Sequence, residues 1–211
     1  MNTNNRTNLW AGCVLAPLCA FALAVGGSHG LSAQQPSAPE EAGPIRGGFH
    51  FSVGLGSASV GASCPSCQSD FFSDRINGFA GNLQIGGAVN SRLIIAAEAM
   101  GWFRNDDPIY RRIAALGLVV LGYPSERSGF FIKGGGGGLR AIAENDFVRA
   151  QTDAWTAQTG IGYDIPVGGR AQLTPQVTYI RTFGAGTWFN GVLSPETVTP
   201  NAIQLGVALT M

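Results

Sequence analysis

The chain has 211 residues, 13 basic and 13 acidic side chains and a net charge of zero, so charge gives no indication of a nucleic-acid partner or an acidic substrate. Charged residues are only 12% of the chain, and glycine occurs 31 times. The basic and acidic residues are scattered, which excludes a charged interaction tail.

The amino-terminal region predicts export. Residues 1–33 combine a polar start that carries Arg6, an apolar run over 9–25 and a small-residue stretch, which is typical of a secretory signal peptide. We expect cleavage after Ala33; cleavage after Gly30 and retention as a membrane anchor are the alternatives. Residues 34–46 are rich in proline and predict a flexible linker, which leaves 47–211 as one domain.

The remaining sequence alternates between apolar and small polar residues, the period of a β-strand. The predicted strands cover residues 49–55, 79–89, 93–103, 110–123, 130–139, 155–165, 172–179 and 201–211. The fourth is apolar on both faces, so the sequence does not assign its sides, and Pro175 in the seventh lacks a donor for the ladder. We therefore predict an all-β domain of eight strands.

The predicted links alternate in length. Short turns at 89–92, 123–129 and 166–170 alternate with longer links at 57–77, 104–109, 141–150 and 184–200. This pattern predicts an antiparallel up-and-down barrel, with the short turns and both ends of the domain on one side. A soluble barrel would show the same period, so the alternation alone does not decide what the outer face contacts.

Three features favour a transmembrane barrel. The polar face consists mainly of small residues that suit a narrow lumen and carries few of the charges that a soluble surface needs. Aromatic residues gather near the strand ends, as in interfacial girdles: Phe49, Phe79, Phe103, Tyr123, Phe130, Trp155, Tyr163, Tyr179 and Phe183. The third feature is the strand at 201–211, which would leave an open edge in the sheet unless it pairs with the first strand. One face of this strand is wholly apolar and consists of Ile203, Leu205, Val207, Leu209 and Met211.

With these strands, the domain resembles the small eight-stranded outer-membrane proteins, the group of the OmpA transmembrane domain, OmpX and Opa. The match is most specific in the last strand, which in that group is the signal read by the assembly machinery, although Met211 replaces the usual terminal aromatic residue. The resemblance implies a bacterial outer-membrane location and contact with outer-membrane lipid and the barrel-assembly machinery. It implies no particular activity, and the sequence indicates no cofactor.

Cys64 and Cys67 lie in the first predicted long loop. Because an exported protein passes through an oxidising compartment, we predict a disulfide between them; a redox or metal site is the alternative.

Two pairs of residues are candidate sites in the lumen. His50 and Ser52 match the His-x-Ser pair of outer-membrane lipid A deacylases, but no partner acid is evident, so we predict a structural histidine. Glu98 and Lys133 lie on the polar face and predict a buried ion pair; Arg140 or Arg112 are alternative partners.

The glycine run at 134–138 is not followed by the Lys-Ser/Thr of a phosphate loop and is assigned to the fifth strand, where it would leave room for Glu98, Met100 and Trp102. Long loops predict surface contacts with an unknown extracellular ligand, and apolar residues at 188–192 would either bind a partner or cover the barrel mouth. The sequence thus predicts a non-enzymatic outer-membrane barrel with a structural or surface-interaction role; a narrow channel or small-ligand carrier, and a lipid-modifying enzyme, are the alternatives.

Overall fold

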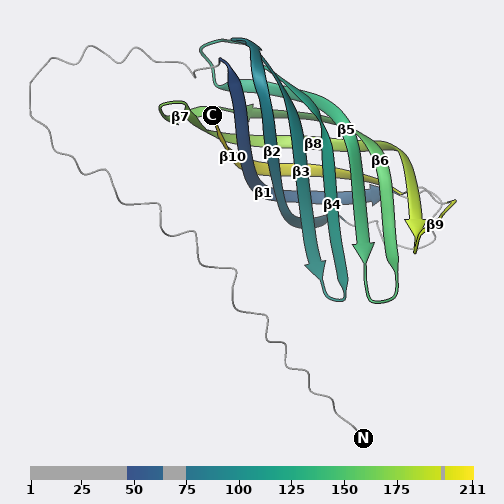
Figure 1. Cartoon of the computed structure of the whole chain (residues 1–211). Coiled ribbons are helices and arrows are strands. Elements are labelled where there is room, and N and C mark those ends of the chain that lie inside the picture. The colour runs from purple at the N-terminus through teal and green to yellow at the C-terminus, as the bar shows by residue number, and fades with distance from the viewer. Residues whose placement is uncertain (1–46, 64–74, 196–197) are drawn as a thin grey trace, which may run out of the picture. The chain divides into compact units, whose positions relative to one another are not determined.

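The computed structural model describes residues 47–63, 75–195 and 198–211, and within them the chain is an antiparallel β-barrel (Figure 1). The ring consists of long strands: β1 (Phe49–Ser63), β2 (Ile76–Asn90), β3 (Leu93–Asp106), β4 (Ile109–Gly122), β5 (Phe130–Glu144), β6 (Arg149–Tyr163), β8 (Ala171–Phe189) and β10 (Thr199–Thr210). Two short strands, β7 (Ile165–Gly168) and β9 (Val192–Leu193), extend the hairpins at the two ends of β8. The predicted eight-stranded all-β fold is confirmed.

The barrel closes between β10 and β1. β10 pairs with β8 on one side and with β1 on the other, where Ser52 faces Thr210 and Leu55 faces Val207. The backbones of Phe51 and Met211 exchange two hydrogen bonds of 2.9 and 2.8 Å. This is the pairing predicted for the last strand, and it places the start of β1 and the C-terminus at the same end of the barrel (Figure 1).

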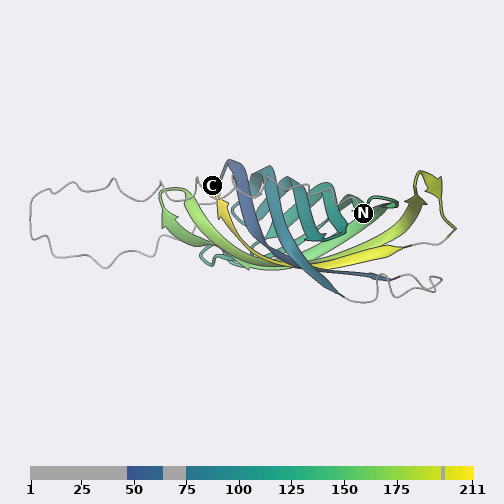
Figure 2. The same cartoon turned by 90° about the horizontal axis from the view of Figure 1, so that it is seen from below.

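The strands tilt strongly around the barrel. In the two views β2 to β5 form one wall and cross β8 and β10 in the opposite wall obliquely (Figures 1 and 2). Closing a sheet of eight strands requires such a tilt, and it leaves a lumen just wide enough for side chains. Within the described ranges there is no helix long and apolar enough to cross a membrane.

The outside of the barrel is apolar. Side chains that point outward from β10 are about half exposed, including Ile203, Leu205, Val207, Leu209 and Met211. β4, whose sides the sequence did not assign, presents Leu116 and Leu118 outward and buries Val119 and Leu121. The apolar outward pattern therefore continues around the ring.

One aromatic residue of the predicted girdle lies elsewhere. Tyr123 is 3% exposed and points into the barrel, whereas Phe49, Trp155 and Tyr163 are exposed outside. β4 ends at Gly122, and the inward side of this strand falls on odd numbers, which continues to Tyr123. The assignment of Tyr123 to the outer surface was wrong because both faces of this strand are apolar.

The strands are longer than predicted, mostly at the end away from the short turns. The predicted link 57–77 is partly strand, since β1 continues to Ser63 and β2 begins at Ile76. The link 104–109 is reduced to the turn between β3 and β4. Residues 56–63 are almost all glycine, alanine and serine, so they carry no alternation to detect. These strands of 12–19 residues are longer than the roughly 9–11 residues that a membrane-crossing strand requires.

The glycines of β5 allow close packing against β4. A Cβ on Gly135 or Gly137 would collide with the β4 backbone at Leu118 or Leu116. The run is a strand, as predicted, but the neighbours that require glycine belong to the β4 backbone, not to Glu98, Met100 or Trp102.

Pro175 is accommodated at a discontinuity in the sheet. It points outward and faces Val207 of β10, while the pairing of β8 with β6 ends at Gly162 and Gln176, one residue away. A residue that cannot donate to the ladder is tolerated where the ladder ends.

Candidate functional site in the barrel lumen

A buried ion pair closes the part of the lumen nearer the short turns, here called the lower lumen. Lys133 Nζ donates to Glu98 Oε1 at 3.0 Å, and both side chains are almost completely buried. Gln84 Nε2 donates to the same oxygen at 2.7 Å, and a bond of 3.2 Å joins Gln84 Oε1 to His50 Nε2. Four inward positions on β1, β2, β3 and β5 thus form one connected network across the barrel.

A second network lies closer to the short-turn end. Asp164 accepts hydrogen bonds from the Tyr123 hydroxyl at 2.9 Å and from Thr174 at 2.8 Å. Thr174 is bonded in turn to Thr210, and Thr210 donates to Ser52 at 3.0 Å. This chain of bonds crosses the seam between β8, β10 and β1, so it ties the closing strands together from the inside.

Apolar side chains fill the remaining side of the lower lumen. The cluster consists of Ile94, Ala96, Val119, Leu121, Tyr123 and Phe131 from β3, β4 and β5. Phe131 is 2% exposed and packs its ring against Tyr123 at a centroid distance of 5.5 Å. At the short-turn end, His50, Tyr123 and Asp164 also line an open recess with an empty volume of about 910 Å³, including the solvent at its mouth.

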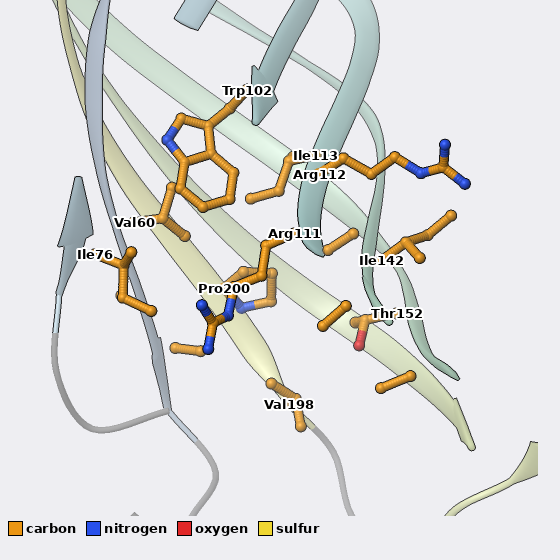
Figure 3. Close-up of a pocket in the computed structure, with 15 residues that line it drawn as sticks. Val60, Ile76, Trp102, Arg111, Arg112, Ile113, Ile142, Thr152, Val198 and Pro200 are labelled. Atoms are coloured by element: carbon orange, nitrogen blue, oxygen red, sulfur yellow. The ribbon is translucent and has the colours of Figure 1, made fainter. Parts of the chain in front are cut away.

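The part of the lumen nearer the long hairpins, here called the upper lumen, is different. It contains an open pocket with an empty volume of about 610 Å³, including the solvent at its mouth, and a second space of about 430 Å³ beneath it. Both are lined by Val60, Trp102, Ile113 and Pro200 (Figure 3). The Trp102 indole N–H donates to the Ala58 carbonyl at 3.1 Å, so its polar atom is satisfied and its ring presents an apolar surface.

A cluster of charges lies at the rim of this pocket. Asp106 accepts from Arg104 at 2.6 Å and from Arg111 at 3.0 Å. Arg111 points inward and its side chain is 17% exposed. In Figure 3 it extends towards Pro200, whereas the adjacent Arg112 extends in the opposite direction. One carboxylate between two guanidinium groups leaves these three side chains with a net positive charge.

The structure separates the candidate residues of the sequence into different partnerships. His50 and Ser52 both point inward, but His50 bonds Gln84 while Ser52 bonds Thr210. Glu98 and Lys133 pair with each other, and Arg140 instead pairs with Asp153 on the outer surface at 2.6 Å. Cys64 and Cys67 lie outside the described residues, so their disulfide remains a prediction.

Two functional features were missed in the sequence. Tyr123 and Asp164 both point inward, one at the end of β4 and the other at the end of β6. They are 41 residues apart in the sequence, so nothing there indicated their hydrogen bond. The apolar pocket is a property of several strands, and residues such as Val60 and Ile113 carry no motif. In the described part of the chain, no group of three or more His, Cys, Asp or Glu side chains could hold a metal ion.

Comparisons with known proteins give a fold and no closer relationship. No protein-family model matches the sequence, and neither does any curated protein. The structure is similar to neisserial surface protein A, with a TM-score of 0.51 and 14% identity over 76% of this chain and 96% of the other. It is also similar to Ail, the attachment invasion locus protein of Yersinia pestis, with a TM-score of 0.51 and 12% identity over 79% of this chain and all of the other. The chain therefore has the fold of the small eight-stranded outer-membrane barrels.

Proposed function

We propose that the chain is a non-enzymatic integral protein of the bacterial outer membrane, with a non-conducting lumen and a structural or surface-interaction role. One observation carries the proposal: a closed ring of strands has an apolar outer face and a polar lower lumen. In water this arrangement would expose rows of leucine, isoleucine and valine around the whole molecule. A bilayer removes that penalty, and closure satisfies the backbone hydrogen bonds that lipid cannot.

The outward row of β10 supports recognition by the barrel-assembly machinery. Ile203, Leu205, Val207, Leu209 and Met211 remain on the surface after closure, so a partner can contact them from the lipid side. The signal peptide at 1–33 and the linker at 34–46 lie outside the described residues and remain predictions. The proposal relies on the signal peptide for export.

The buried ion pair of the lower lumen supports a non-conducting barrel over the alternative of a channel. An ion would have to displace Glu98 and Lys133, which bond each other, and Gln84, which donates to Glu98. Breaking such a pair inside a low-dielectric lumen costs several kcal/mol. His50 and Ser52 bond different partners, so this pair does not supply the contact between nucleophile and base that the lipid-modifying alternative requires.

The hairpin tips support a surface-interaction role. Phe147, between β5 and β6, is 86% exposed, and Val192 and Leu193 of β9 are also exposed. The two tips are adjacent, because Asn190 accepts from the Arg149 backbone and donates its own N–H to the Arg149 carbonyl. Apolar side chains gathered at the rim of a barrel suit contact with another surface.

Gel migration of the membrane fraction tests the barrel itself. We expect the unboiled protein to migrate differently from the boiled protein on an SDS gel, because a closed barrel resists the detergent. A chain that runs identically in both conditions and fractionates with the soluble periplasm would refute the proposal.

Labelling on intact cells tests the orientation. With Cys64 and Cys67 replaced by serine, a membrane-impermeant maleimide should modify a Phe147→Cys variant on whole cells. It should modify an Arg170→Cys variant, in the turn before β8, only after permeabilisation. The opposite pattern would contradict the proposed surface role of the hairpins. Conductance in planar bilayers should stay at zero for the unmodified chain; steady channels would favour the alternative function.

A further inference from the structure

The upper lumen contains an apolar pocket to which the proposed function assigns no ligand. We propose that it takes one single-chain anionic amphiphile, with the acyl chain inside the apolar pocket and the anionic head at the Arg111 rim. The proposal goes beyond a structural barrel, and a non-conducting barrel could exist with or without it.

The chemistry of the pocket interior indicates an apolar chain. Its walls are contributed by Val60, Trp102, Ile113 and Pro200 together with small residues such as Ala141. The polar atoms nearest to this interior already have partners: the Trp102 indole bonds the Ala58 carbonyl, and the Thr152 hydroxyl bonds Thr187. A polar solute would find few groups to replace its bonds to water, whereas an acyl chain loses none.

The shape of the pocket indicates a slender chain rather than a bulky ring system. The two spaces share four lining residues and follow one another along β1 from Val60 to Ala58. Residues 58–62 of β1 span about 14 Å at a rise of roughly 3.4 Å per residue. This length suits an extended chain of about ten carbon atoms between the rim and the ion-paired lower lumen.

The rim supplies the charge complementarity. Arg104 and Arg111 share the single carboxylate of Asp106, so the cluster carries a net positive charge. A guanidinium has five N–H donors, and Arg111 therefore keeps donors for a second carboxylate while it remains bonded to Asp106. Its partial burial strengthens such a bond relative to one in water. A neutral alcohol of the same length would lack this interaction.

Quenching of Trp102 fluorescence by a brominated chain reports occupancy directly. The probe is decanoate brominated at its methyl end, added to the full chain in phosphatidylcholine nanodiscs. Trp10, Trp155 and Trp188 are replaced by phenylalanine, which leaves Trp102 as the one tryptophan of the sequence. We expect saturable quenching above the linear background that comes from bromide in the bilayer.

Matched variants separate the pocket from the bilayer. Ala141→Phe places a ring in the pocket and should abolish the saturable component. Ala157→Phe adds the same ring on the exposed outer face of β6 and should leave it unchanged. Quenching that is linear in the parent, or equally saturable in Ala141→Phe, would overturn the proposal.

Two arginine substitutions test the head group. Arg111→Gln should weaken decanoate binding about tenfold, the effect of losing one charge-assisted hydrogen bond, and Arg140→Gln, on the outer surface, should not. The protein with its arginines unchanged should also bind brominated decanol about tenfold more weakly than brominated decanoate, and this comparison needs no further substitution. Equal affinities for the acid and the alcohol would overturn the anionic assignment. A heat-modifiable gel shift in each variant verifies that it has folded.

Discussion

The lower and upper halves of the lumen are lined by the same strands but differ in the chemistry of their inward side chains. On β1 the inward positions change from His50 and Ser52 to Ala58 and Val60, and on β3 they change from Glu98 to Trp102. In the lower half the charges of Glu98 and Lys133 are paired in isolation from solvent, whereas in the upper half the charges lie at the rim of an apolar pocket. The same strands can therefore carry a buried ion pair in one half and an apolar pocket in the other, because their inward side chains change in chemistry along the strand.

The largest difference should appear when one charge is removed in each half. Glu98→Ala leaves Lys133 buried without its carboxylate and should lower the free energy of unfolding by about 3–5 kcal/mol. Asp106→Ala at the solvent-exposed rim should cost less than about 1 kcal/mol. Urea unfolding in lipid vesicles, followed by tryptophan fluorescence, measures both.

The double substitution Glu98→Leu with Lys133→Met sharpens this result. It removes both charges, so it should recover most of the stability lost in Glu98→Ala. A loss under about 1 kcal/mol in the single variant, or no recovery in the double variant, would show that the pair does not carry the stability of the lower lumen.

A matched deletion of two methyl groups compares packing. Val119 is completely buried in the lower lumen, so Val119→Ala should cost about 2 kcal/mol through lost burial and an unfilled cavity. Val60 lines the open pocket, so Val60→Ala should cost under about 1 kcal/mol. The same unfolding experiment measures the two values, and equal losses would contradict the contrast between the halves.

A hydroxyl tests the network at the short-turn end. Tyr123→Phe removes the bond to Asp164 and should cost about 1 kcal/mol, the net contribution of a typical hydrogen bond. Tyr110→Phe, on the outer side of β4, serves as the control and should change the unfolding free energy by less than about 0.5 kcal/mol. If both substitutions are neutral, the second network does not stabilise the seam.

The smallest effect concerns the turns that enclose the lower end. The hydrogen bond from Ser91 and the charge of Arg92 lower the pKa of Glu126 below its ordinary value. Because the folded pKa is the lower one, this contribution is complete above the ordinary carboxyl pKa and is lost as the pH falls through the folded value. Glu126→Gln should remove that part of the acid dependence. NMR titration of the Glu126 carboxyl carbon measures the pKa, and a value at or above the ordinary one would contradict the assignment.

The fold was predictable from the sequence where apolar and polar residues alternate clearly. The strand at 201–211 followed from its unbroken alternation, and its pairing with the first strand followed from an open edge that had to be paired. The upper ends of the strands were not predictable, because glycine, alanine and serine in residues 56–63 give no alternation. The sides of β4 could be assigned only from its neighbours, since both faces are apolar.

The lumen was predictable only in part. Glu98 and Lys133 were candidates because a charge on an inward face needs a partner. The choice between Lys133 and the two arginines depended on strand register, which period-two patterns do not give. The apolar pocket depended on register as well, since its walls come from residues of several strands that are ordinary in their local sequence.

The seam between β1 and β10 also sets an order of events. The two strands that exchange the bonds of Phe51 and Met211 lie at opposite ends of the described chain, so β1 has no partner on that side until β10 has been made. Every earlier stage of synthesis therefore has an open strand edge that can pair with the wrong chain. Pairing over such a long sequence separation is also intrinsically slow. We therefore expect the edge of β1 to stay open to wrong pairing until β10 is available.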